Sequence, residues 1–185
     1  MRIITGEFKG RRLYPPADRR VRPTSDMIKE ALFSMVAPWL EGAVAVDLFT
    51  GTGNLGLEAI SRGAGLVYFA DIDRESINLT KKNIAHCGGE ARARVLQCDW
   101  ERALDRISGP VDIFFLDPPY GSGLLEPCLR RIGEKGLLAE DGVVAAEHGA
   151  DKPLPEEFPG LSLVKKRKHG TICISLYQTR KESDS

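Results

Sequence analysis

The sequence has no long hydrophobic segment, since no apolar run approaches the roughly 20 residues that a membrane-spanning helix needs. Its first residues, MRIITGEFKGRR, include basic side chains but lack the apolar stretch of a secretory signal. None of the cysteines forms a CxxC pair, and the histidines are equally scattered, so no zinc-ligand spacing is present. We therefore expect a cytoplasmic protein with reduced cysteines, no membrane segment and no metal site.

The chain also lacks a net charge, because 26 Lys and Arg residues balance 26 Asp and Glu residues. Taken alone, this balance argues against a nucleic-acid partner. The charges are unevenly placed, however: residues 1–29 and 165–185 are net basic, and the segment between them is acidic. Basic ends around an acidic middle indicate a polyanion partner, although such ends can also be solvated or paired with the acidic body.

The composition, with 42% hydrophobic and 28% charged residues in 185, is that of one ordinary globular domain and disfavours disorder. Short apolar runs alternate with stretches of helical periodicity, which predicts a parallel sheet with helices on both faces. A helix starting after Thr24, its predicted N-cap, precedes this region and ends before Pro38. The predicted strands are 44–48, 66–70, 93–97, 111–116 and 142–147, with helices at 54–62, 74–86, 100–107 and 124–133. Residues 161–167 and 171–178 form a closing hairpin, which brings the count to seven strands and places an antiparallel strand at one edge.

A glycine-rich segment follows the first predicted strand and opens the next helix. Gly51, Gly53 and Gly56 form G-x-G-x-x-G, which permits a tight turn and a close approach of backbone N–H groups to a ligand. Ligands of such sheets bind beyond the carboxyl ends of the strands. The segment therefore favours a nucleotide-like ligand, although a purely structural turn also uses glycine.

Carboxylates follow the next two strands. Asp71 stands 20 residues after Gly51, a distance that suits hydrogen bonds to ribose hydroxyls, and the neighbouring Asp73 can share that role or be a solvated loop residue. After the third strand, Asp99 can accept a hydrogen bond from an adenine amino group, or it can simply cap the following helix.

The fourth strand ends in Asp117-Pro118-Pro119-Tyr120. Two prolines fix their own φ angles and keep the preceding residue extended, so the carboxylate and nearby carbonyls are held rigidly. Such acceptors can bind an exocyclic amino group, and Tyr120 offers a face for base stacking, worth roughly 1–3 kcal/mol per base. The alternative is a rigid turn with an aromatic lid.

Together these motifs resemble those of class I S-adenosylmethionine-dependent methyltransferases, and more narrowly the RsmD family, which methylates the N2 amine of a guanine in bacterial 16S ribosomal RNA. The narrower resemblance spans nearly the whole chain. It rests on Arg2-Ile3-Ile4-Thr5-Gly6 with Lys9-Gly10-Arg11, on Arg22-Pro23-Thr24-Ser25-Asp26, on Glu30-Ala31-Leu32-Phe33 and on Gly170-Thr171.

The resemblance implies a Rossmann-like methyltransferase domain over residues 24–185 behind a basic N-terminal extension over residues 1–23. It also implies a monomer that uses S-adenosylmethionine and acts on 16S ribosomal RNA, within an assembling small subunit. Asp71 departs from the glutamate expected at its position, and Cys98 is an unusual neighbour whose backbone N–H can still serve the ligand. The expected catalytic residues are Asp117, Pro118, Pro119 and Tyr120, and the expected cofactor-binding residues are Thr24, Asp47, Thr50, Gly51, Thr52, Gly53, Asn54, Gly56, Asp71, Asp73, Cys98 and Asp99. From the charge pattern, the expected RNA-binding residues are Lys9, Arg11, Arg12, Arg19, Arg20, Arg22, Lys165, Lys166, Arg167 and Lys168.

Other function classes stay open. An amino methyltransferase acting on adenine N6, cytosine N4 or a protein amide fits the Asp117 motif equally well. Only 70 positions separate Asp47 from Asp117, which leaves no room for an inserted DNA-target domain. An NAD-dependent dehydrogenase fits the motif poorly, and a non-catalytic RNA-binding module is the alternative of another class.

Overall fold

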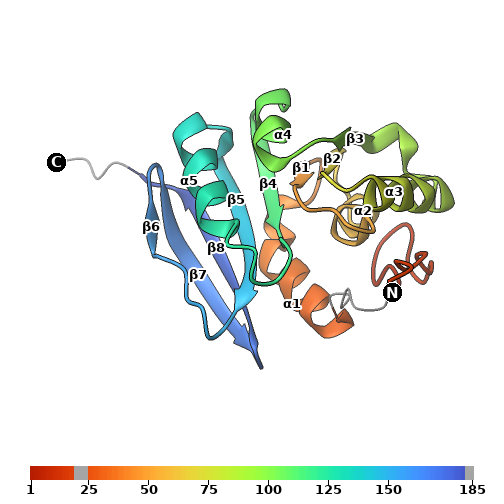
Figure 1. Ribbon diagram of the computed structural model, residues 1–185, viewed down its shortest axis with the longest axis horizontal. Helices are drawn as coiled ribbons and strands as arrows, with labels where there is room; N and C mark the ends of the chain where they lie inside the picture. Colours follow the sequence, from red (N-terminus) through yellow and green to blue (C-terminus); the bar gives the residue numbers. More distant parts are fainter. Residues whose placement is uncertain (19–24, 182–185) are drawn as a thin grey trace.

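The computed structural model describes residues 1–18 and 25–181 of the chain. In this part, helices cover both faces of one central sheet (Figure 1). The strands are β1 (Val44–Asp47), β2 (Leu66–Asp71), β3 (Ala93–Gln97), β4 (Val111–Leu116), β5 (Leu138–Gly149), β6 (Glu157–Phe158), β7 (Leu161–His169) and β8 (Ile172–Thr179). The helices are α1 (Asp26–Val36), α2 (Asn54–Ser61), α3 (Arg74–Cys87), α4 (Trp100–Arg106) and α5 (Leu125–Lys135), with short 3-10 turns at Ala37–Trp39 and Glu90–Arg92.

The strand order is β3-β2-β1-β4-β5-β8-β7-β6. Strands β1 to β5 run parallel, whereas β8, β7 and β6 are each antiparallel to the preceding neighbour in that order. The predicted parallel sheet and closing hairpin are therefore confirmed. The predicted count of seven is wrong, because the described residues form an eighth strand, the two-residue β6, which is too short to carry an alternation pattern.

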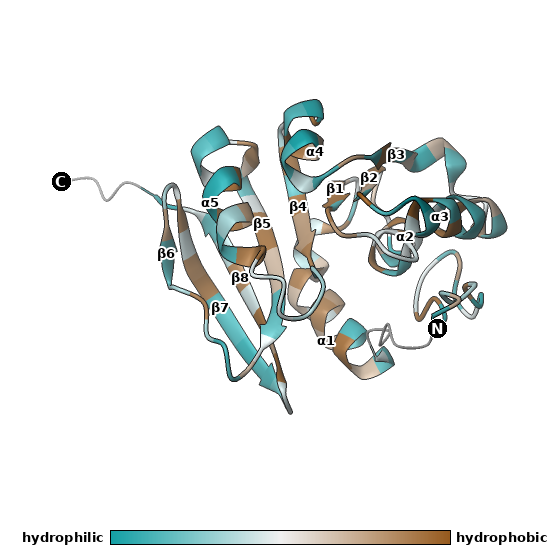
Figure 2. Cartoon of the chain, viewed as in Figure 1, coloured by the Kyte–Doolittle hydropathy of each residue, from teal (hydrophilic) through white to brown (hydrophobic). Residues whose placement is uncertain are grey.

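Two apolar layers enclose the sheet. Phe115 of β4 faces α1, where its ring lies 5.3 Å from that of Phe33, while Phe114 belongs to the layer under α4 and α5. Consecutive strand residues point to opposite faces, so β4 must be apolar throughout. Figure 2 shows the hydrophobic residues along the inner strands and hydrophilic ones over α3, α4 and α5.

The N-terminal segment is part of the fold in its described residues. Glu58 of α2, whose side chain is fully buried, accepts the backbone N–H groups of Ile4 and Thr5. The predicted boundary after residue 23 falls among residues 19–24, which lie outside the described part of the chain. Residues 1–18 are not a free extension, because three of their side chains belong to the core under α2: Ile3, Phe8 and Leu13.

Helix α1 begins one residue later than the predicted cap implies. Ser25 is the N-cap, and its side-chain oxygen accepts the backbone N–H of Ile28 at 3.2 Å. Thr24 itself lies outside the described residues. The serine supplies the same hydroxyl chemistry as threonine, which is why the sequence does not distinguish the two neighbours.

Candidate active site

A cleft opens at the carboxyl ends of β1, β2, β4 and β5, where the strand order reverses between β1 and β4. Its volume is about 2220 Å³, whereas a pocket for one small ligand usually has roughly 300–1,000 Å³. The cleft therefore has room for two ligands side by side. Its rim is partly apolar, because three large hydrophobic side chains that are exposed line it: Met27, Ile72 and Tyr120.

Asp47, at the end of β1, holds the glycine-rich loop through hydrogen bonds. It is 1% exposed, and its Oδ2 accepts hydrogen bonds from the Thr50 hydroxyl at 2.9 Å and the Gly56 N–H at 3.0 Å. Burial raises the pKa of this carboxyl to about 7, and the carboxylates of Asp117 and Asp71 contribute to the rise. The side chain thus holds the loop together at the bottom of the cleft.

The three glycines of the loop have different roles. Gly51 (φ 57°) faces open space, with no atom within 4 Å of an added Cβ, and Gly53 (φ 85°) is the N-cap of α2. Both take the left-handed conformation that glycine adopts without strain. An added Cβ on Gly56 would lie 2.3 Å from Cε1 of Phe69, so Gly56 packs α2 against β2. Of the three glycines, Gly51 lines the cleft, and Gly56 has a packing role; that they bind a cofactor stays a prediction.

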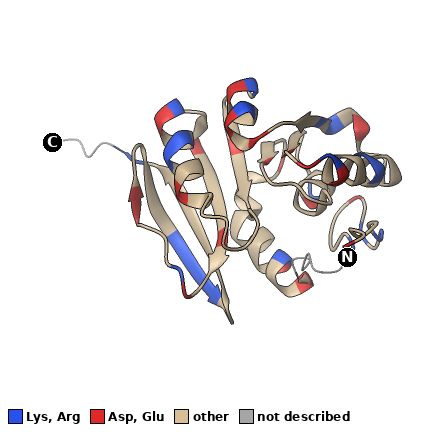
Figure 3. Ribbon diagram, viewed as in Figure 1, with Lys and Arg blue, Asp and Glu red and all other residues tan. Residues whose placement is uncertain are grey.

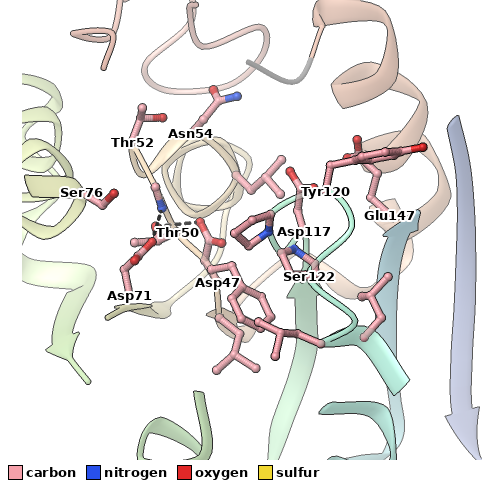
Figure 4. Close-up of a pocket in the computed structure, with 18 of the residues that line it drawn as sticks. Asp47, Thr50, Thr52, Asn54, Asp71, Ser76, Asp117, Tyr120, Ser122 and Glu147 are labelled. Carbon is pink, nitrogen blue, oxygen red and sulfur yellow. Dashed lines mark hydrogen bonds between the residues drawn. The ribbon is translucent and has the colours of Figure 1, made fainter. Parts of the chain in front are cut away.

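Asp71 ties the end of β2 to this loop. Its Oδ2 accepts the Gly51 N–H at 2.9 Å (Figure 4). Its Oδ1 accepts the Asp73 N–H at 3.0 Å. An ionised carboxylate has about four acceptor positions, so Asp71 keeps capacity for ligand hydroxyls. Asp73 is the N-cap of α3, and its carboxylate accepts the Ser76 N–H at 2.8 Å. Of the two, Asp71 has the better geometry for a ligand in the cleft.

The end of β3 contributes less than expected. The Cys98 N–H donates to the Asp71 carbonyl at 3.1 Å and is thus hydrogen-bonded within the protein, so a role of Cys98 in cofactor binding stays a prediction. Asp99 is the N-cap of α4, where its Oδ1 accepts the Arg102 N–H at 2.9 Å. Both residues line the cleft. The capping role and a ligand role are compatible, because the second oxygen of Asp99 faces only a long 3.7 Å ion pair with Arg102.

The remaining loop side chains bond mostly within the protein. Asn54 is 7% exposed, and its Oδ1 accepts a hydrogen bond from Lys29 Nζ at 2.8 Å. The carbonyl of Thr52 accepts the Asn83 side-chain amide at 2.8 Å. Together with the Thr50–Asp47 bond, these contacts hold the loop in shape before any ligand arrives. A loop already ordered loses little entropy on binding.

The segment after β4 forms the opposite wall. Asp117 and Glu147, on adjacent strands, lie together with Tyr120 in Figure 4. Tyr120 is 75% exposed and lies beside Gly149, where an added Cβ would come within 3.2 Å of the phenol oxygen. Lys152 Nζ lies 5.8 Å from the centroid of this ring, which lines the cleft. Stacking of a base on Tyr120 stays a prediction.

The basic segment on β7 leads toward the cleft. Lys165, Lys166, Arg167 and Lys168 are exposed on β7, which leads to the hairpin end 169–172 that lines the cleft (Figure 3). Residues 15–18 line it from the N-terminal side, but they are Pro, Pro, Ala and Asp and carry no basic side chain. Only the basic segment on β7 is thus shown to lead to the mouth of the cleft, among the described residues.

Individual N-terminal basic residues differ in availability. Lys9 and Arg12 are exposed. Arg11 donates to the carbonyls of His86 and Cys87 at 3.0 and 2.9 Å, which caps the end of α3. Its guanidinium thus has a structural role. The predicted RNA-binding residues Arg19, Arg20 and Arg22 lie outside the described residues, as does the predicted cofactor residue Thr24.

Two cleft residues escaped the sequence reasoning. Ile72, which is 72% exposed, directly follows Asp71, and Glu147 ends the apolar run of β5. The signal for Ile72 is an apolar residue directly after a strand-terminal acid. The signal for Glu147 is an acid at the end of a buried strand. Among residues 1–18 and 25–181, no group of His, Cys, Asp and Glu side chains could hold a metal ion. In the same residues no helix is long and apolar enough to cross a membrane.

This sheet order, with a glycine loop after β1, an acid after β2 and Asp-Pro-Pro-Tyr after β4, defines a methyltransferase-like α/β protein. The family model described as "Conserved hypothetical protein 95" matches residues 1–178, and the chain belongs to this family, the RsmD family.

Curated relatives and solved structures support this family assignment. The ribosomal RNA small subunit methyltransferase D of Escherichia coli (strain K12) is 34% identical over 100% of this chain and 93% of its own length. YlbH of Bacillus subtilis (strain 168) is 38% identical over 97% of this chain and 100% of its own. The structure of Escherichia coli YhhF superposes with a TM-score of 0.86 at 34% identity, covering 97% of each chain.

Proposed function

We propose that the protein transfers a methyl group from S-adenosylmethionine to the exocyclic N2 amine of a guanine in small-subunit (16S) ribosomal RNA. One observation carries this proposal: the glycine loop and Asp117 to Tyr120 open into a single cleft with room for a cofactor and a nucleotide. The ribosomal substrate is supported by the names of the relatives, which include methyltransferase D proteins of the small ribosomal subunit.

The residues on the β1 and β2 side fit the cofactor. The backbone at Gly51 is open to the cleft, and Asp71 has acceptor capacity for ribose hydroxyls. Exposed Ile72 offers an apolar surface beside them for a purine ring. When bound there, S-adenosylmethionine supplies an already activated methyl group, so the protein need not provide a strong base.

The residues on the β4 side hold the target amine. The lone pair of guanine N2 is delocalised into the ring, which makes the amine a poor nucleophile. Hydrogen bonds from this amine to Asp117 and to the carbonyls near Pro118 favour the tetrahedral nitrogen that forms during transfer. Tyr120 stacks on the base and keeps its N2 aligned.

The basic surface supplies binding energy for the RNA. A base inside a helix must first leave its stack, at a cost of a few kcal/mol. Phosphate contacts by Lys9, Arg12 and the exposed cluster on β7 offset that cost. We propose that the enzyme acts as a monomer, in the cytoplasm, on the RNA of an assembling small subunit.

The test is methylation of small ribosomal subunits from a strain that lacks this enzyme, with labelled S-adenosylmethionine and mass mapping of the product. We expect one N2-methylguanine in 16S RNA. Asp117→Ala should abolish transfer and leave cofactor binding nearly unchanged, whereas Asp105→Ala, at an exposed carboxylate on α4, should retain activity. Label found only in protein, or only on adenine or cytosine, contradicts the proposal.

A further inference from the structure

Glu147 is a partly buried acid of the cleft that the proposed reaction does not yet use. It stands near the carboxyl end of β5, where Ala146 pairs with Leu116 of β4 in parallel register. Asp117 directly follows the last residue of β4, and Glu147 is the next residue of β5, so the same register carried one residue further places both side chains on one face of the sheet. Figure 4 shows both beside Tyr120 in the cleft.

One carboxyl oxygen of Glu147 has no partner. Its Oε2 atom is buried and forms no hydrogen bond with the described residues. Burial raises the pKa of Glu147 to about 8, and the neighbouring Asp117 adds to the rise, so the site favours the neutral acid. A buried polar atom without a partner is unfavourable, because it has lost its hydrogen bonds to water. A ligand that supplies the missing hydrogen bonds removes this penalty.

His148, the next residue of β5, is not available to bind a ligand in the cleft. His148 is 7% exposed, and its Nε2 lies 2.9 Å from the Ser175 hydroxyl. Its Nδ1 lies 3.0 Å from the carbonyls of Gly149 and Lys152. The imidazole is thus bound within the protein, on the side of the strand opposite Glu147.

We infer that Glu147 recognises the target base, by hydrogen bonding to the ring N–H that adjoins the methylated amine. The inference rests on the proposed function. Guanine presents O6 as an acceptor, N1–H as a donor and the N2 amine as a donor, in a row. A neutral carboxyl group has one O–H donor and one carbonyl acceptor. The Glu147 hydroxyl matches O6 and its carbonyl matches N1–H, while Asp117 accepts from the amine.

The same pairing disfavours the other amino bases. In adenine and cytosine the ring nitrogen beside the amine carries a lone pair and no hydrogen. With the amine held by Asp117, the Glu147 hydroxyl can still donate to that nitrogen, but the position next to it in adenine is a C–H. Glu147 then forms one hydrogen bond fewer than with guanine. It is therefore a specificity residue as well as a binding residue.

The test combines changes in the enzyme with a change in the base. Once the target guanine has been mapped, a ligated 16S RNA fragment carries 2-aminopurine at that position, which keeps the amine but lacks N1–H and O6. Methyl transfer to both RNAs is measured for the wild type, Glu147→Leu and Glu147→Gln. Glu140→Leu, at an exposed glutamate of the same strand, is the matched control.

We expect the wild type and the Glu140 variant to prefer guanine over 2-aminopurine by about 10- to 100-fold in kcat/KM. Glu147→Leu should lose most of that preference while still binding S-adenosylmethionine in a titration. Glu147→Gln should keep it, because its amide also offers one carbonyl acceptor and one donor. Unchanged preference in Glu147→Leu, or its loss in Glu147→Gln, overturns the inference. Failure of the wild type to methylate guanine contradicts the proposed function instead.

Discussion

Replacing Glu58 by glutamine is expected to destabilise the fold and to loosen the N-terminal segment. The Glu58 carboxylate has no solvent exposure, and it accepts hydrogen bonds from Ile4 N–H and Thr5 N–H and from Arg62 Nε at 2.9 to 3.1 Å. Lys29 Nζ lies 3.0 Å from its Oε2, and the Lys29 side chain is 1% exposed. Glutamine leaves this ammonium with neutral acceptors alone.

The size of this destabilisation follows from the burial of both Glu58 and Lys29. Removing one member of a buried ion pair costs about 3–5 kcal/mol, because the other charge stays desolvated. The free energy of unfolding falls by roughly 1–3 kcal/mol per molar urea in small proteins. With a slope at the upper end of this range, the urea concentration at the unfolding midpoint should fall by about 1–2 M. Burial also lowers the pKa of Lys29, although Glu58 opposes that change, so loss of Glu58 should lower it further.

The assay is urea unfolding followed by circular dichroism, combined with limited trypsin digestion at Lys9 and Arg12. Glu157→Gln is the control, because Glu157 forms an exposed ion pair with Arg180 and its loss should cost less than about 1 kcal/mol. The double variant Lys29→Met/Glu58→Gln should recover much of the stability, since it leaves no unpaired buried ammonium. Equal effects of Glu58→Gln and Glu157→Gln would refute the reasoning.

Three further predictions concern the cleft. Gly56→Ala should lower the free energy of unfolding by about 1–3 kcal/mol, because the new methyl group overlaps the Phe69 ring; an unchanged melting temperature would contradict it. Asp47 has a pKa of about 7 in the folded protein against 3.8 normally, so the folded state binds its proton more tightly. Its contribution to stability therefore falls as pH rises from about 4 to 7, by about 1.4 kcal/mol per pH unit. Asp47→Asn should flatten the pH dependence of the urea midpoint over this range, and an unaltered slope would show that Asp47 ionises normally. Tyr120→Ala should weaken RNA binding by roughly 1–3 kcal/mol in a filter-binding titration while Tyr120→Phe retains affinity; equal loss in both would exclude stacking as the cause.

Local patterns predicted most of the sheet. The segments 44–48, 66–70, 93–97 and 111–116 all contain parallel strands. The inner strand β4 is nearly continuous in hydrophobic residues because it is buried on both faces, whereas the edge strand β3 has exposed Arg94 and Gln97. The hairpin was located by the turn at Gly170, which has a φ of 62°. Two-residue β6 carried no such signal, and the neighbours Thr24 and Ser25 could not be told apart as caps.

Some features of the candidate site could be predicted from the sequence, and others could not. Gly51, Asp71 and Tyr120 could be proposed from sequence because each lies at the end of a strand or four residues beyond it, where parallel topology brings it to one edge. The uses of Asp73 and Cys98 within the protein depend on hydrogen bonds to Ser76 and to the Asp71 carbonyl, which no spacing rule contains.

The sequence by itself determined the order of the strands along the chain, the glycine turn and the position of Asp117 after β4, because these features depend on periodicity and local backbone geometry. Only the tertiary structure decided that the N-terminal segment is anchored by Glu58 and that Glu147 lies beside Asp117. Both pairings join residues far apart in the chain. Their partners, burial and ionisation are set by packing, which local patterns do not encode.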